Sequence, residues 1–329
     1  MTGLPYVFVG STDGNLRAFT VNPSDGALTP AGNIDAGQDL DFIALGPDDA
    51  TLFVSLGASV AAFVYDRAER SFTPSGDAPT SGAGTHVAVD ASGNYVFVAH
   101  YNEGELSFFS YSEDAGFGSG ETLSPGQNAH QARIDPAGLH VYVPCLGSNH
   151  VAQYTLEPGS GSLSASAPLT VAASGGPRHM DFNTDATRAY VLTENSSQIH
   201  AYDVNPATGV LSPRPADSQY LAMDQEYHWS SDVHVTPDGR FLYATNRDPS
   251  ELVRFEIGTA GGLSRLGATP LSGVVRAFAV DTRGEYLYVG GDDGNLVAFR
   301  IDAATGGLSS MATTSGLGNI RATVARELR

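Results

Sequence analysis

The sequence contains no lysine, one cysteine and no long apolar run, and each absence excludes a class of protein. All 17 basic residues are arginine, against 36 acidic residues, so the formal net charge is −19. Such a surface repels nucleic acid and anionic membranes. The single cysteine, Cys145, excludes an intramolecular disulfide. No stretch approaches the roughly 18 apolar residues of a membrane span, and no basic-then-apolar leader is found, so we expect a soluble cytoplasmic protein.

A repeat fills the whole chain. Each unit has an apolar strand, a turn of the type Asp-x-x-Gly or Pro-Asp-Gly, an aromatic strand, a polar turn, a third strand and Gly-x-Leu. The 38 Gly and 18 Pro are spread evenly, as expected of turns between many short strands. The aromatic strands recur every 44 to 53 residues. Their aligned aromatic residues are Phe8, Phe53, Phe97, Tyr142, Tyr190, Tyr243 and Tyr288.

Seven units of about 45 residues with four strands each predict an all-β fold, a seven-bladed β-propeller. The chain begins on an aromatic strand, Tyr6–Val9, without a first strand before it, and residues 320–324 look like an orphan first strand. We therefore expect the C-terminal strand to complete the first blade. No interdomain linker is visible, which predicts a single domain over residues 1–329.

The insert at residues 213–230 is the main break in the period. It is rich in aromatic and polar residues, including Tyr220, Tyr227, His228 and Trp229. Two interpretations remain open, a flap over one face or a loop packed on the rim.

Polar residues replace apolar ones at matching positions of the repeat. In a propeller, first strands line the central channel, and the loops after second strands open on the same face. On or near first strands we find His86, His130, Arg178, His179, Asp232, His234, Arg276 and Arg321. Just after second strands come His100, Asn102, Glu194 and Arg247.

These polar positions predict an anion site. Charge buried near one axis costs several kcal/mol unless it is paired or hydrated. The plainer interpretation, in which channel side chains pair with one another, is as plausible for any one residue as a role in binding. A metal site is a weaker alternative, because no His-x-x-x-His or Cys-x-x-Cys spacing occurs and the arginines would repel a cation. The run Gly116–Gly120 does not join a strand to a helix, so no dinucleotide cofactor is expected, and we expect no cofactor or metal at all.

The chain resembles the lactonase-type seven-bladed propellers, which include bacterial 6-phosphogluconolactonase and the carboxy-cis,cis-muconate lactonizing enzyme. The resemblance lies in the segment 176–180, which reads Gly-Pro-Arg-His-Met, in Glu194 downstream, in residues 232–247 and in His130. It implies that His130, Arg178, Glu194 and Arg247 form the catalytic set. The family's Pro-Arg-Gly-like segment is Val-Arg-Ala here, so Arg276 is kept but its surroundings are not.

Three functions follow as hypotheses. The first is hydrolysis of an anionic sugar lactone, 6-phosphogluconolactone above all. Arg178 and Arg247 would hold the phosphate or carboxylate, Glu194 would activate water and His130 would donate a proton. His86, His179, Asp232, His234 and Arg276 are candidate substrate-binding residues.

The second hypothesis is lactonisation of a carboxylated muconate, and the third is a propeller that binds a ligand or protein without catalysis. The expected partner is a small anionic molecule rather than nucleic acid or membrane. The oligomeric state stays open.

Overall fold

The strands of the computed structural model follow the repeat read from the sequence. The structure describes residues 4–37, 39–222 and 229–328. Within them, seven antiparallel sheets are built on four strands each, as a seven-bladed propeller requires. The expected fold is confirmed. Among the described residues, no helix has the length and apolarity needed to cross a bilayer.

The chain divides into two compact units. The first unit comprises Met1–Val98, Phe109–Gly120 and Ser272–Arg329, and the second comprises Ala99–Phe108 and Glu121–Leu271. The expectation of one domain stays a prediction.

Three sheets lie in the first unit. One contains β29 (Ile320–Leu328), β1 (Leu4–Ser11), β2 (Asn15–Val21) and β3 (Leu28–Asp35), in that order. The next contains β4 (Leu40–Leu45), β5 (Thr51–Leu56), β6 (Ser59–Asp66) and β7 (Ser71–Pro79). The third contains β25 (Val275–Val280), β26 (Tyr286–Gly291), β27 (Leu296–Ile301) and β28 (Leu308–Thr314).

Three further sheets lie in the second unit. One contains β12 (Arg133–Ile134), β13 (His140–Cys145), β14 (His150–Leu156) and β15 (Leu163–Ala172). The next contains β16 (Pro177–Phe182), β17 (Arg188–Thr193), β18 (Gln198–Val204) and β19 (Leu211–Pro213). The third contains β21 (Ser230–Val235), β22 (Phe241–Arg247), β23 (Ser250–Ile257) and β24 (Leu263–Pro270). The remaining sheet, whose residues are divided between the units, contains β8 (Gly84–Val89), β9 (Tyr95–His100), β10 (Glu105–Ser112) and β11 (Gly116–Leu123).

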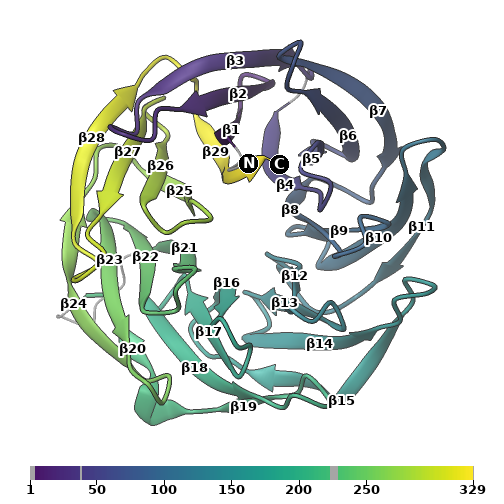
Figure 1. Cartoon of the computed structure of the whole chain (residues 1–329). Helices are drawn as coiled ribbons and strands as arrows, with labels where there is room; N and C mark the ends of the chain where they lie inside the picture. The colour runs from purple at the N-terminus through teal and green to yellow at the C-terminus, as the bar shows by residue number, and fades with distance from the viewer. Residues whose placement is uncertain (1–3, 38, 223–228, 329) are drawn as a thin grey trace. The chain divides into compact units, whose positions relative to one another are not determined.

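Strand β29 completes the first sheet, as the orphan strand at the C-terminus predicted. It lies beside β1 (Figure 1). The two strands are antiparallel, with Val324 opposite Phe8 and Leu328 opposite Leu4. Ile320, Ala322 and Leu328 are buried. Residues from the two ends of the chain therefore share one sheet.

The repeated aromatic residues are buried in second strands. Every residue of β5 and of β13 is buried, whereas β11 is mostly exposed. This explains why second strands are mostly apolar and outer strands are polar. In the second unit, the Tyr142 hydroxyl donates to Gly209 O at 2.6 Å and the Tyr190 hydroxyl to Gly261 O at 2.8 Å. Each tyrosine thus ties its own sheet to a turn of the next sheet.

The insert contains the short helix η1 (Pro215–Asp217) and strand β20 (Gln219–Tyr220), which pairs with β18. These parts pack along the edge of their own sheet. The flap interpretation concerns the whole insert, residues 213–230, of which residues 223–228 lie outside the described residues, so the choice between a flap and a rim loop stays open.

Candidate functional site

Polar residues on first strands coincide with β-bulges. The pairing of β16 with β17 shifts between Pro177 and His179, so Arg178 is the extra residue. The pairing of β21 with β22 shifts between Ser230 and Val233, across Ser231 and Asp232. A bulge leaves a residue out of the ladder and turns its side chain in a new direction. The bulges therefore explain how charged residues occur in strands that are otherwise buried and apolar.

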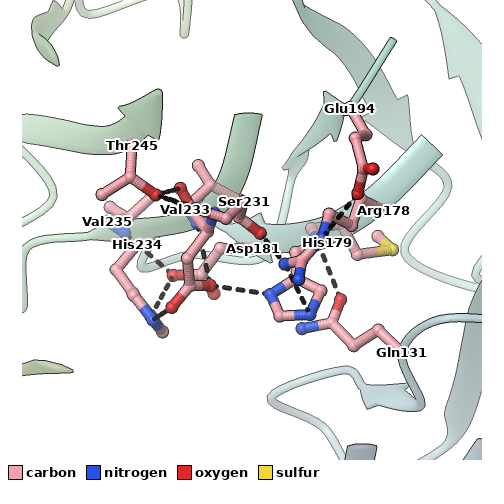
Figure 2. Close-up of polar contacts among 12 residues, drawn as sticks. Gln131, Arg178, His179, Asp181, Glu194, Ser231, Val233, His234, Val235 and Thr245 are labelled. Atoms are coloured by element: carbon pink, nitrogen blue, oxygen red, sulfur yellow. Dashed lines mark hydrogen bonds and ion pairs between the residues drawn. The ribbon is translucent and has the colours of Figure 1, made fainter. Parts of the chain in front are cut away.

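Two arginines from neighbouring sheets meet at one carboxylate. Arg178 Nε donates to Glu194 Oε2 at 3.0 Å (Figure 2), and Arg247 Nη2 lies 2.8 Å from Glu194 Oε1. The side chains of Arg178, Arg247 and Glu194 are 6%, 10% and 20% exposed. Two guanidinium groups and one carboxylate leave this triad with a single net positive charge in an otherwise acidic protein.

Backbone contacts hold the triad in place. The amide of Glu194, directly after β17, donates to Gly176 O at 2.7 Å, and the amide of Ser230 donates to Glu194 O at 3.3 Å. Arg178 Nη1 donates to Ser231 O across the two sheets. Arg247 Nη2 is buried and, among the described residues, makes the ion pair with Glu194 without the alignment of a hydrogen bond. Its N–H groups keep donor capacity that an anion could use.

A second chain of contacts starts beside the triad. His179 Nδ1 lies 2.7 Å from Asp232 Oδ1, and His234 Nε2 lies 3.1 Å from Asp232 Oδ2. Asp232 therefore lies between the two imidazoles. Figure 2 shows His179 next to Arg178. The chain continues through Asp181, which is paired with Arg133 and accepts the amide of Val235 at 2.8 Å.

The charge states along this series of contacts follow from the groups that surround each residue. Burial, and next the Arg178 charge, lower the pKa of His179, which is therefore neutral. Burial alone would raise the pKa of Asp232, but His234 and His179 outweigh it and hold that pKa well below the usual value. Burial opposes the charge on His234, but Asp232 outweighs it and raises the pKa of His234. An ionised Asp232 only accepts hydrogen bonds, so His179 Nδ1 donates to it and His179 Nε2, 3.5 Å from Arg178 Nη1, is an acceptor.

His130 lies on the other side of His179. The two rings meet edge to face with centroids 5.2 Å apart, and Tyr101 contacts His130 in the same way at 5.6 Å. The His130 amide donates to Pro144 O at 2.9 Å. The second unit therefore gathers most of the predicted site: His130, Arg178, His179, Glu194, Asp232, His234 and Arg247.

Two predicted substrate-binding residues lie in the first unit. His86, in β8, is buried against Phe42, with ring centroids 4.0 Å apart. Arg276 is the extra residue of a bulge where the pairing of β25 with β26 shifts between Val275 and Ala277. Their part in a common site with the second-unit residues stays a prediction.

Sequence reasoning missed several residues of this network. Asp181 joins His234 to Arg133, and Gln131 accepts the amide of Met180 at 2.7 Å. Both are polar residues that the structure buries in segments interpreted as structural. A polar residue at a buried position was the signal that could have identified them. In the described part of the chain, no group of three or more His, Cys, Asp or Glu side chains is arranged to hold a metal ion.

The comparisons with known proteins agree with this architecture. Residues 6–322 match the family model described as lactonase, 7-bladed beta-propeller. A 6-phosphogluconolactonase of Pectobacterium carotovorum subsp. carotovorum is 29% identical over 294 residues, which cover 88% of this chain and 89% of the relative. One of Erwinia tasmaniensis is 28% identical over 303 residues, 90% of this chain and 91% of the relative.

Solved structures show the same fold at lower identity. The periplasmic gluconolactonase of Pseudomonas aeruginosa superposes with a TM-score of 0.88 at 21% identity, covering 98% of this chain and 99% of the other. A Bacteroides fragilis protein superposes with a TM-score of 0.87 at 22% identity, covering 98% of both chains. The family match over nearly the full length, on a chain with seven four-stranded sheets, shows that this protein belongs to the seven-bladed β-propeller lactonase family.

Proposed function

We propose that this protein hydrolyses an anionic sugar lactone, namely 6-phosphogluconolactone, to the open-chain sugar acid. The observation that carries the proposal is the triad of Arg178, Glu194 and Arg247, with donor capacity left on Arg247 Nη2. Its net positive charge suits a phosphate or carboxylate. The relatives named 6-phosphogluconolactonase support the substrate class.

The triad suggests how substrate binding prepares the base. Without substrate, Glu194 neutralises part of both guanidinium charges and keeps them in position. An incoming anion competes for the same N–H groups through charge-assisted hydrogen bonds. Glu194 is then released from one or both arginines, and its carboxylate can accept a proton.

The reaction follows from these roles. Water attacks the lactone carbonyl while Glu194 accepts its proton, and the carbonyl oxygen takes up negative charge. Collapse of the tetrahedral intermediate breaks the bond to the ring oxygen, which takes a proton from His130. The product carries a hydroxyl group and a carboxylic acid, which ionises at neutral pH. His179, Asp232 and His234 lie beside this centre and are proposed to contact the substrate.

The test is a pH-stat assay with freshly generated 6-phosphogluconolactone, measured against spontaneous hydrolysis in buffer. We expect acid release well above the buffer rate. Arg247→Gln removes one charge-assisted contact and should lower kcat/KM by about 10- to 100-fold. Arg67→Gln, at an exposed position of the first unit, is the matched control and should behave like the wild type.

Two results would contradict the proposal. One is a wild-type rate equal to that of buffer, and the other is equal activity in the two variants. Loss of the diene absorbance of a carboxylated muconate, without lactone hydrolysis, would show a cycloisomerase instead. Binding of sugar acids with no turnover of either substrate would show a binding propeller. The expected cytoplasmic location also stays a prediction, and one solved neighbour is a periplasmic protein.

A further inference from the structure

Trp229 has an unusual combination of backbone conformation and exposure. It is the only tryptophan in the chain, its φ is 49°, and it is 49% exposed. A bulky residue at positive φ is an outlier, because its Cβ crowds the backbone. Among the exposed large apolar side chains of the described residues, it is the only aromatic one. Strain of this kind persists only where the surroundings enforce it, and it is concentrated at functional sites.

Arg247 holds the backbone carbonyl of Trp229. Its backbone N–H and its Nε both donate to Trp229 O, at 3.1 and 2.8 Å. Its guanidinium carbon also lies 5.8 Å from the centroid of the Trp229 ring. The same guanidinium is paired with Glu194, so the indole is tied directly to the triad.

Exposure rises from the interior of the triad toward this indole. Arg178 is the most buried member, Arg247 and Glu194 are partly exposed, and Trp229 is half exposed. A ligand whose anionic group binds the arginines from the solvent side would extend its remaining atoms past the ring. An indole face is electron-rich and apolar, and the C–H groups of a sugar ring carry the complementary partial positive charge.

We propose that Trp229 is a substrate-specificity residue, an aromatic wall on which the C–H face of a sugar lactone stacks while its anionic group binds Arg247. The inference rests on the proposed function and deepens it, because it selects lactones that carry both a sugar ring and an anionic group. The strained backbone of Trp229 is the means by which the ring is held beside Arg247.

The single tryptophan allows a direct test. Acrylamide is a neutral quencher, so its access to Trp229 does not depend on the acidic surface. We expect saturating 6-phosphogluconate, the stable product, to lower the Stern–Volmer constant by about twofold, whereas inorganic phosphate leaves it unchanged. Phosphate can bind the arginines but has no ring to cover the indole. Unchanged quenching at 6-phosphogluconate concentrations that inhibit hydrolysis would overturn the proposal.

Variants separate the aromatic ring from the backbone strain. Asn adopts positive φ readily, so Trp229→Asn removes the ring without opposing the local backbone. We expect its KM for 6-phosphogluconolactone to rise about tenfold with little change in Tm. Trp229→Phe keeps an aromatic face and should lose less than Trp229→Asn.

Leu266→Asn is the control, since Leu266 is an exposed apolar residue of the same unit at 42% exposure. If both variants are active and have the same KM, the proposed role of Trp229 is wrong, while the lactonase proposal is unaffected. Absence of hydrolysis in the wild type would instead remove the proposed function itself. The two failures are therefore distinguishable.

Discussion

At the scale of single residues, the candidate site is built from two clusters of paired polar side chains. Arg247, Glu194 and Arg178 form one part, and Asp232 with its two histidines forms the other. Each buried charge has an opposite charge or a hydrogen-bond partner within a few ångströms, which offsets the cost of removing it from water. The arrangement positions the guanidinium of Arg178 from both sides.

Replacement of Asp232 should make the stability of the protein depend differently on pH. Asp232 raises the pKa of His234, so the stabilisation from this pair is complete below the ordinary histidine pKa of about 6.5 and is lost as pH rises through the higher folded value. Asp232→Asn should therefore lower Tm more at pH 6 than at pH 9. Its cost at pH 6 should be roughly 1.5–3 kcal/mol, as for hydrogen bonds to charged groups.

Thermal melts at the two pH values check this prediction. Asp114→Asn, at an exposed position in the turn before β11, is the control for loss of one negative charge. Equal losses of Tm at both pH values would contradict the assignment of a charged His234.

At the scale of elements, strand β29 completes the first sheet. It pairs with one edge of β1 at eight positions, from Leu4 to Ser11. A central or inner strand with an unpaired edge exposes hydrogen-bonding groups that invite aggregation. Joining the two ends of the chain in one sheet removes that edge.

A buried charge in β29 should therefore destabilise the protein strongly. Ala322 is buried in the core next to β1 and β4, so Ala322→Asp should cost about 3 kcal/mol or more. Ala303→Asp, on an exposed turn of the same unit, should stay within about 0.5 kcal/mol of the wild type. Denaturant melts measure both. Similar unfolding midpoints for the two variants would show that β29 contributes little.

At the scale of the whole molecule, the dominant quantity is the formal net charge of −19. Like charges on a compact chain repel one another and reduce its stability, while they keep it soluble. The arginines proposed to bind substrate would act against this field, so their positive charge has to be gathered in one place.

Salt should consequently stabilise this protein at low ionic strength. Raising NaCl from about 0.01 to 0.1 M shortens the Debye length from about 30 to 10 Å and screens the repulsion. We expect Tm to rise over this range and then to level off. Differential scanning calorimetry is the measurement, and sucrose at the same osmolality is the control. A Tm that stays constant or falls would show that attractive ion pairs outweigh the repulsion.

The sequence by itself determined the repeat, the seven sheets and the strand that completes the first of them. These are properties of pattern, because a second strand covered on both faces is buried along its whole length and therefore mostly apolar, as β5 and β13 are. It also predicted the arginines, histidines and carboxylates of the candidate site, since polar residues at apolar positions of a repeat are visible without coordinates. It did not reveal Asp181 or Gln131, whose partners lie about 50 residues away.

Only the tertiary structure decided which of these residues meet. Arg178 and Asp232 stand in bulges, which shift the register by one residue and turn a side chain that simple alternation would place elsewhere. The sequence predicts Glu194 as the base that activates water but does not show its partners, and the structure places it between two guanidinium groups. The backbone carbonyl of Trp229 accepts two hydrogen bonds from Arg247, a contact that only the structure shows. Such contacts depend on the register and packing of neighbouring sheets, and the spacing of residues along the chain does not contain them.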